Sequence, residues 1–378
     1  MKILLVKGYP LLSSVGVLAR GLKKRGHDIH VLVPAEHSDG YAMRSAGIPT
    51  HTLAMRPPGF TGLLRAAGTL RSLRRLLREH RFDVVHLNLA HARLYGRIGS
   101  RLGGRPVVVS SIRGLEARYE RWCNRLDDAT VAVSATVKGF LLASGIPATR
   151  IETIVNGVDL DALDAVPSDP SYLHRELGLA PATRLVGMVA YFRNHLLKGH
   201  KVFLDAAKLV AERFDDVAFV LVGSSLSRHG YNKEFFERYA LSLGIAERVH
   251  FLGERFDVPA IMSSLYAHAL PSYREGCPMV VLEAMARGAP NVASDIASIG
   301  EIVDHGRDGI LFEAGNHDAL ARALGGLLDD PAAARAIAVG GRRRIETAYR
   351  ANDMTERYES LFSRLVDSRR PVPARRAE

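Results

Sequence analysis

The chain has 378 residues, of which 47% are hydrophobic and 24% charged, so it is long enough for two domains with sizeable cores. Its 2 cysteines, Cys123 and Cys277, form neither a disulfide framework nor a zinc-site spacing, which favours a reducing compartment such as the cytoplasm. The apolar start of the chain is too short for a signal peptide, and no run of about 18 apolar residues predicts a transmembrane helix.

The net charge of +11 is confined to the first part of the chain. Residues 1–165 contain 24 Lys and Arg against 13 Asp and Glu, whereas residues 166–378 contain 27 of each. Such an excess can serve nucleic-acid affinity, attraction to anionic lipid headgroups, or solubility alone. No nucleic-acid recognition motif accompanies it, so no nucleic-acid partner is expected.

Strands and helices are predicted to alternate along the first half. Residues 2–6, 11–25 and 27–33 read as strand, helix and strand, which is a βαβ unit with a right-handed crossover. The turn after the first strand lacks the G-x-G-x-x-G pattern, which disfavours a dinucleotide site there. Further strands are expected at 52–55, 82–87, 106–110, 129–134 and 151–154, and helices at 91–102, 115–126 and 135–143.

Residues 60–80 predict a basic amphipathic helix. Leucines recur at helical spacing along one side, and arginines occupy the other side with a single acid, Glu79. A helix of this kind can lie on an anionic membrane. The alternative is that the leucines pack on the sheet and the arginines are solvated, and the sequence leaves both open.

The pattern restarts after residues 162–181, which contain several prolines and acids and suit a domain boundary. The prediction is an α/β fold with two Rossmann-like doubly wound domains, 1–165 and 166–352, followed by a helix at about 353–368 that can pack back on the first domain and a disordered tail at 369–378. Ligands of such sheets bind at the carboxyl ends of the strands, so two facing domains would hold theirs in a cleft between them. In the second domain, strands are expected at 185–189, 218–223, 249–252, 267–271, 291–294 and 309–312, and helices at 201–213, 233–243, 258–264, 300–303, 317–328, 332–348 and 354–366.

One stretch, residues 271–286 with the sequence PSYREGCPMVVLEAMA, combines an anion site with carboxylates. It ends a strand and starts a helix, with Pro278 expected in the first helical turn, where its missing N–H would be unpaired anyway. The amides of a helix N-terminus attract anions, and Glu275 and Glu283 offer carboxylates to hydroxyl groups. A ligand with phosphates and several hydroxyls, such as a nucleotide-sugar, fits both. The plain alternative is a helix start with two surface glutamates.

Two other loops of the second domain follow predicted strands and carry suitable chemistry. Arg193 and Lys198 lie between a strand and a helix, where two cations suit a diphosphate, although a solvated loop explains them equally. Gly253 would let the backbone approach a flat ligand such as a base, and Arg255 follows it closely.

The segment PSYREGCPMVVLEAMARGAP resembles the signature of the retaining glycosyltransferases of family 4, which have the GT-B fold. The passage ending in Asn156-Gly157-Val158-Asp159, the segment from Arg193 to Lys198-Gly199, and the segments VHFLGERFDVPAIM and IGEIVDHGRDGILF are similar to further parts of that family. The resemblance runs from about residue 83 to 350. Several motifs in the same order make a chance likeness very improbable.

The resemblance implies roles for individual residues. Arg193 and Lys198 would bind the donor diphosphate and stabilise it as it leaves. Glu283 would accept the ribose hydroxyls, and Glu275 would contact the transferred sugar. By the same resemblance the backbone of Gly276, Cys277, Met279 and Val280 would lie near sugar and phosphate, with Gly253 and Arg255 by the base. The family retains anomeric configuration and generally needs no metal, so no cofactor is expected.

The chain also departs from the family pattern. The loop after the first strand, residues 9–14, lacks the glycine pair of many members, and Arg113 stands where many have a histidine that faces the sugar. A guanidinium cannot act as a base at neutral pH, though it could hold phosphate or an acidic acceptor. His91 and His86 are nearby substitutes, each more easily explained by a structural role. Ala267 and Ala297-Ser298 replace residues that are common in the family, which leaves the donor open.

The expected function is therefore that of a retaining, nucleotide-sugar-dependent hexosyltransferase. Its partners would be a nucleotide-diphosphate sugar and a glycan or lipid-linked acceptor of the cell envelope, at the cytoplasmic face of the membrane, with the basic first domain in peripheral contact with anionic lipid. The alternatives are a nucleotide-sugar epimerase of similar shape, and a catalytically weak binding partner in glycan assembly.

Overall fold

The chain forms two compact units in the structure, a computed structural model that describes residues 1–6, 14–34, 44, 46–53, 62–88, 90–115, 124–192, 195–224 and 232–369. The first unit comprises Met1–Gly157 and Ala351–Glu378, and the second comprises Val158–Arg350. The first segment of the first unit therefore ends at Gly157, earlier than the predicted boundary at residue 165. Helix α7 (Leu160–Asp164) already belongs to the second unit. There the Arg287 guanidinium donates to the carbonyl oxygens of Leu163 and Val166 at 2.9 and 3.0 Å.

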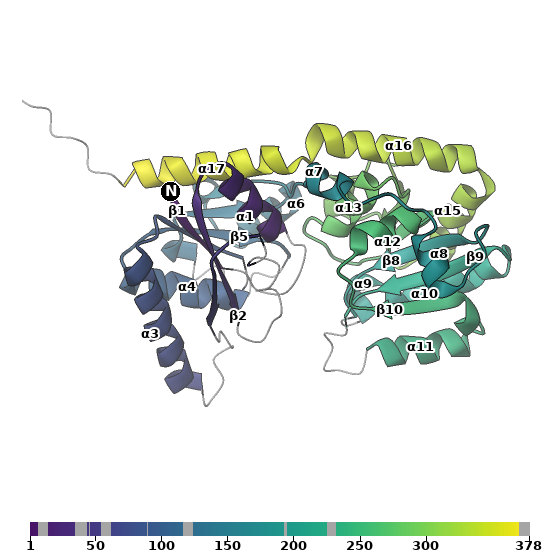
Figure 1. Ribbon diagram of the computed structural model, residues 1–378, viewed down its shortest axis with the longest axis horizontal. Helices are drawn as coiled ribbons and strands as arrows, with labels where there is room; N and C mark the ends of the chain where they lie inside the picture. Colours follow the sequence, from purple (N-terminus) through teal and green to yellow (C-terminus); the bar gives the residue numbers. More distant parts are fainter. Residues whose placement is uncertain are drawn as a thin grey trace, which may run out of the picture. The chain divides into compact units, whose positions relative to one another are not determined.

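The first unit is built on a parallel sheet of seven strands in the order β3-β2-β1-β4-β5-β6-β7 (Figure 1). The strands are β1 (Lys2–Val6), β2 (Asp28–Pro34), β3 (Thr50–Leu53), β4 (Val84–Leu87), β5 (Val107–Ile112), β6 (Ala129–Ala132) and β7 (Ile151–Thr153). The helices are α1 (Ser14–Lys24), α3 (Gly62–His80), α4 (Ala90–Leu102), α6 (Ala135–Ala143) and α17 (Ala351–Asp367), with short 3₁₀ turns η1 (Asn124–Leu126) and η2 (Ala148–Arg150).

Both faces of this sheet are buried, which is why its strands read as continuous apolar runs. Along β1, Ile3 and Leu5 pack in one core cluster with residues of α1 and α17, while Leu4 and Val6 pack in another with residues of α3 and α4. The last helix of the chain thus completes the first unit.

The second unit contains a parallel sheet of six strands in the order β10-β9-β8-β11-β12-β13. The strands are β8 (Arg184–Val189), β9 (Val217–Val222), β10 (Val249–Gly253), β11 (Ala267–Leu270), β12 (Asn291–Ser294) and β13 (Ile310–Phe312). The helices are α7, α8 (Tyr172–Leu177), α9 (His195–Lys198), α10 (His200–Ala211), α11 (Lys233–Ser242), α12 (Val258–Ser264), α13 (Met279–Ala286), α14 (Ala297–Gly300), α15 (His317–Asp329) and α16 (Pro331–Ala348), with η3 (Ala246–Arg248).

Three sequence-based expectations were wrong in detail. Strand β3 begins at Thr50, not at residue 52, because its pairing with β2 sets its limits: Val31 lies opposite Thr50. Helix α14 ends at Gly300, where the sequence prediction had a helix begin. Residues 162–181, which were expected to form the domain boundary, lie inside the second unit. They contain α8 and the end of α7, which Asp159 caps by accepting from the Ala162 amide.

Candidate active site

In each sheet the strand order reverses at one point. In the second sheet this point lies between β8 and β11, and it positions the candidate site. In the second unit the chain leaves β8 toward β9 on one side and later returns to β11 on the other. In open parallel sheets the carboxyl ends of the two central strands splay apart at such a point and leave a crevice for a ligand. The loops after β8 and β11 are the two that the sequence marked with cations and carboxylates.

An ion pair joins these two loops. The Lys198 ammonium, at the end of α9, lies 2.6 Å from a carboxylate oxygen of Glu275, in the loop after β11. The side chains keep 24% and 10% of their exposure, so a ligand arriving from solvent can reach both. The structure thus brings together two residues that were predicted to serve the donor diphosphate and the transferred sugar.

Gly199 makes this approach possible. Its φ is +72°, in the left-handed region, and a Cβ at this position would lie 1.9 Å from the Pro271 carbonyl oxygen. The two loops are also fastened by the Tyr273 amide, which donates to the Leu197 carbonyl oxygen at 3.0 Å. Only glycine fits at this position, which explains why glycine follows Lys198 in the sequence.

The helix after the loop starts one residue later than the sequence indicated. Pro278 has φ −72° and ψ 111°, which is extended backbone, and therefore stands at the N-cap of α13 rather than in its first turn. The Pro278 carbonyl oxygen accepts the Val281 amide at 3.2 Å. Met279 and Val280 are partly exposed at the helix start, whereas Gly276 and Cys277 are buried just before it. The amides of a first turn have no partner within their helix, which suits an anion.

Glu283 lies in the second turn of α13, and the pKa of its carboxyl is strongly raised. Desolvation by the surrounding protein raises its pKa to about 8, from an ordinary value of 4.5. The residue remains partly exposed. A carboxyl that loses water without gaining a cation is prepared for hydroxyl or amide donors from a ligand.

Sequence reasoning overlooked Ser272. This residue is fully buried in the loop after β11, and its hydroxyl has no hydrogen-bond partner among the described residues. Buried hydroxyls are nearly always paired, so this one marks a place where a ligand or water completes the structure. The Pro-Ser of the motif was the available signal, but only burial shows that the hydroxyl lacks an acceptor.

Arg255 is held by two carboxylates of its own unit. Its guanidinium donates to Asp257 at 2.6 and 2.8 Å and to Glu176 at 2.9 Å, and these hydrogen bonds raise its pKa further above the ordinary range. Gly253, at the end of β10, has φ +68°, and its carbonyl oxygen accepts the Gly223 amide at 2.8 Å. A contact of either residue with a base stays a prediction.

In the first unit, Arg113 follows β5 and connects three segments at the carboxyl ends of the strands. Its guanidinium donates to Asn88, after β4, at 3.2 and 3.3 Å, and to Asn156 at 2.9 Å, and it also contacts the Ser14 hydroxyl at the start of α1. The side chain is partly buried. Arg113 therefore organises the loop ends of this sheet with a permanent positive charge.

His86 is part of the core of the first unit. It is fully buried, its Nε2 lies 2.7 Å from the Ser111 hydroxyl, and that hydroxyl lies 2.8 Å from the Tyr358 hydroxyl of α17. Burial, with a smaller effect of Arg113, lowers its pKa to about 3, so the imidazole is neutral. These contacts support a structural role for His86.

Arg193 and the side chain of His91 lie outside the described residues, so their predicted roles stay predictions.

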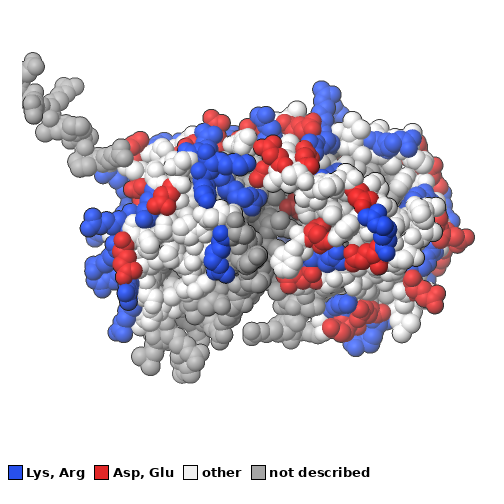
Figure 2. All heavy atoms as spheres, viewed as in Figure 1, with Lys and Arg blue, Asp and Glu red and all other residues white. Residues whose placement is uncertain are grey.

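The basic helix α3 uses its leucines for packing. Leu73 and Leu77 are buried in a cluster with Leu4 and Val6 of β1, while the arginines of its other face, Arg71, Arg74, Arg75 and Arg78, are exposed. Figure 2 shows Lys and Arg side chains along the edge of the first unit where α3 lies. None of the described helices combines the length and the apolar character that crossing a membrane requires.

Comparison with known proteins agrees with this arrangement. A family model described as Glycosyltransferase Family 4 matches residues 13–162, and one described as Glycosyl transferases group 1 matches residues 183–330. The Escherichia coli UDP-Gal:alpha-D-GlcNAc-diphosphoundecaprenol alpha-1,3-galactosyltransferase is 28% identical over 71% of this chain and 72% of its own length. The phosphatidyl-myo-inositol mannosyltransferase of Mycobacterium leprae is 28% identical over 92% of each chain.

The fold is shared with solved structures. HepE from Anabaena, in complex with UDP and glucose, matches with a TM-score of 0.83 and 24% identity over 96% of this chain and 99% of its own. This likeness confirms the predicted α/β fold class, with two Rossmann-like domains of the GT-B type. Since the two family models together span most of both units, the chain belongs to glycosyltransferase family 4.

Proposed function

We propose that this protein is a retaining glycosyltransferase that moves a hexose from a nucleotide-diphosphate hexose to a hydroxyl of a glycan or lipid-linked acceptor. The observation that carries the proposal is the ion pair of Lys198 and Glu275 where the strand order of the second sheet reverses. The desolvated carboxyl of Glu283, in the helix that follows the same loop, adds to it. The relatives that transfer galactose to a diphosphoundecaprenol-linked sugar and mannose to phosphatidyl-myo-inositol support a hexose and a lipid-linked acceptor.

Lys198 would exchange partners when the donor binds. Without a ligand, its ammonium is neutralised by Glu275 at 2.6 Å. A diphosphate brings two negative charges to the same crevice and would compete for the ammonium, which stabilises the charge that grows on the leaving group. Glu275 is then free to accept hydrogen bonds from the hydroxyls of the transferred sugar.

The transfer itself would proceed on one face of the sugar. The bond between the anomeric carbon and the diphosphate oxygen breaks, and the electron pair leaves with the nucleoside diphosphate. The acceptor hydroxyl forms its bond to the same carbon from the same side, and its proton passes to an oxygen of the leaving phosphate. This route preserves the anomeric configuration and assigns no base to the first unit, which is compatible with Arg113 at the position after β5.

A direct test compares three variants of the purified protein. A panel of UDP- and GDP-hexoses is first ranked by thermal shift. Transfer from the best donor to diphosphoundecaprenol-linked GlcNAc or phosphatidylinositol acceptors is then measured, and NMR of the product gives the anomeric configuration. We expect Lys198→Ala and Glu275→Gln to lose about 100- to 1,000-fold in kcat, the usual effect of removing one group that stabilises developing charge. Lys208→Ala, which alters a partly exposed lysine of α10, should stay near wild type.

Two results would contradict the proposal. One is conversion of the donor into another nucleotide-hexose without any acceptor, which would indicate an epimerase. The other is the absence of transfer by the wild-type protein from every donor that it binds, which would leave the partner role in glycan assembly as the better explanation. Full transfer by the Lys198→Ala protein would remove the role of Lys198 alone. A product with inverted configuration would remove the retaining mechanism alone.

A further inference from the structure

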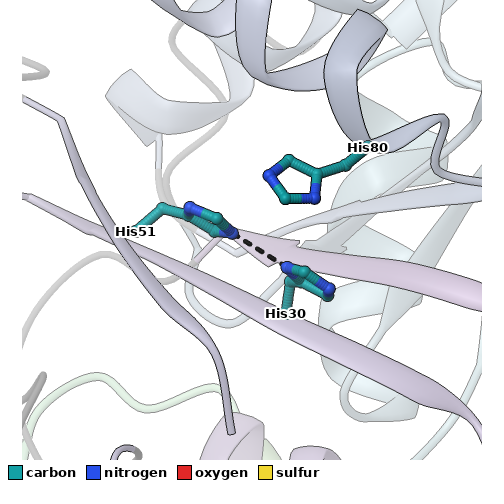
Figure 3. A group of neighbouring side chains, drawn as sticks. All are labelled: His30, His51 and His80. Carbon is teal, nitrogen blue, oxygen red and sulfur yellow. Dashed lines mark hydrogen bonds between the residues drawn. The ribbon is translucent and has the colours of Figure 1, made fainter.

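Three histidines meet at the edge of the first sheet. His30 lies in β2, His51 in the edge strand β3, and His80 is the last residue of α3 (Figure 3). Side chains alternate along a strand, so His30 points to the same face as Leu32, and Leu32 lies opposite His51 in the strand register. Helix α3 packs on that face and brings His80 over the other two.

This cluster and Arg113 lie at opposite ends of the strands of the first sheet. Helix α3 ends at His80 and the chain re-enters the sheet at the start of β4, so the histidines lie toward the amino ends of the strands. Arg113 and Asn88 lie at the opposite, carboxyl ends. None of the three histidines lies in the motifs of the family resemblance, which begin at about residue 83.

The nitrogen atoms of the cluster are close enough to share one ion. Each histidine offers one ring nitrogen, and the three nitrogens lie within 4.8 Å of one another. His30 Nδ1 and His51 Nε2 are 2.9 Å apart. Ligands at about 2.0–2.1 Å from a tetrahedral zinc ion lie about 3.4 Å from one another, so small rotations of the rings would place all three around one ion.

Asp28 fixes the ring of His30 in the required orientation. Its carboxylate lies 3.3 Å from Nε2, which leaves Nδ1 directed into the cluster. Histidine ligands of metals usually donate their second ring N–H to a carboxylate in this way, which sets the tautomer and raises the basicity of the ligating nitrogen. Lys2, 3.3 Å from the other Asp28 oxygen, adds a positive charge that this ion pair partly offsets.

Two of the three histidines, His51 and His30, have a lowered pKa. Burial first, and then the neighbouring His30 and His80, lower the pKa of His51 to about 4. Burial also lowers the pKa of His30. A neutral imidazole is the form that binds a metal.

Ring packing alone explains only part of the arrangement. Phe82 contacts His30 edge-on at 5.1 Å between ring centroids and stacks near His80 at 5.6 Å. Phenylalanines would satisfy such packing equally well and would have no polar atoms to bury. Packing does not require that nitrogens from three separate elements lie within 4.8 Å of one another, with a carboxylate beside one of the three rings.

We propose that His30, His51 and His80 bind one late first-row divalent cation, with zinc preferred, and a water molecule as the fourth ligand. Imidazole nitrogens suit zinc, nickel and copper, whereas magnesium and manganese prefer oxygen ligands, which the cluster does not supply. A bound ion would tie the C-terminal end of α3 to the exposed edge of the sheet. The site would therefore stabilise the first unit, independently of the donor site in the second.

The test uses full-length protein without a histidine tag, stripped of metal by a chelator. Competition with a chromophoric zinc chelator gives the stoichiometry and affinity, and cobalt absorption reports tetrahedral coordination. We expect one zinc per chain, no competition from magnesium, and a higher melting temperature with zinc. His51→Phe and His80→Phe keep a ring for packing but remove a ligand, so each should weaken zinc binding by more than about 100-fold, beyond the 10- to 100-fold typical of changing an outer partner.

Controls make the result decisive. His317→Phe alters a partly exposed histidine of the second unit and should leave zinc binding unchanged. The proposal is wrong if the wild-type protein shows no saturable zinc site, or if both ring-preserving variants bind zinc as the wild type does. Circular dichroism establishes that the variants are folded. If one of the two unfolds, the other decides.

Discussion

The raised pKa of Glu283 should make the stability of the protein depend on pH. In the folded state this carboxyl has a pKa of about 8, against an ordinary value of 4.5. Between these values the folded state binds more protons than the unfolded state, so stability falls as the pH rises. Glu283→Gln has nearly the same shape and cannot ionise, so the variant should lack this part of the pH dependence.

The magnitude follows from the shift. Each pH unit over which the folded carboxyl stays protonated and the unfolded one is ionised lowers the free energy of unfolding by about 1.36 kcal/mol. From pH 6 to pH 8 the contribution of Glu283 therefore falls by about 2 kcal/mol, because at pH 8 half of the folded molecules are already ionised at this residue. For a unit of this size, about 2 kcal/mol corresponds to about 4–8 °C in melting temperature. The difference between Glu283→Gln and wild type should grow by that amount between pH 6 and pH 8.

Differential scanning calorimetry at pH 6, 7 and 8 measures this difference for the unfolding transition of the second unit. Glu254→Gln is the matched control, because Glu254 is exposed in the same unit, and its melting temperatures should run parallel to those of the wild type. If the curves of Glu283→Gln also run parallel to the wild type across the three pH values, Glu283 ionises normally and the reasoning fails.

Two further predictions concern ligands. Hydrogen bonds from ribose hydroxyls favour the charged form of Glu283, so binding of the matching nucleoside diphosphate at pH 7 should release about 0.9 proton. Isothermal titration calorimetry in buffers of different ionisation enthalpy measures the number of protons released. If the binding enthalpy does not change with the ionisation enthalpy of the buffer, Glu283 does not bind the ribose in its charged form. The exposed arginines of α3 should draw the protein to anionic vesicles at about 1 kcal/mol each, so replacing three with Gln should weaken flotation with phosphatidylserine vesicles more than 100-fold. The test triple is Arg71, Arg74 and Arg78, and the control triple in the second unit, expected to leave flotation unchanged, is Arg322, Arg335 and Arg343.

Local signals in the sequence were sufficient for most secondary structure. Apolar runs such as residues 2–6 and 218–222 predict buried strands because both faces of a parallel sheet exclude water. The errors fell where such signals are weak. Strand β3 is short and only partly buried, so its limits depend on its pairing with β2. Helices α7 and α8 are too short for a periodic pattern and depend on caps and tertiary contacts.

The candidate site divides in the same way. The sequence by itself determined which residue types follow the strands, and the order of the motifs was enough to indicate the family and the carboxylates Glu275 and Glu283. It could not show that Lys198 meets Glu275, which lies 77 positions away, because the contact depends on the strand order of the sheet.

Tertiary structure also decided the role of side chains for which the sequence allowed more than one. Only packing shows that Leu73 and Leu77 of the basic helix are buried in the core, while Arg71, Arg74, Arg75 and Arg78 of the same helix are exposed. The meeting of His30, His51 and His80 has no sequence signature either, since strand register and a helix end bring together residues that are far apart in the chain. Periodicity and motifs act over a few residues, whereas burial, pKa and shared ligands arise only when distant segments exclude water from one another.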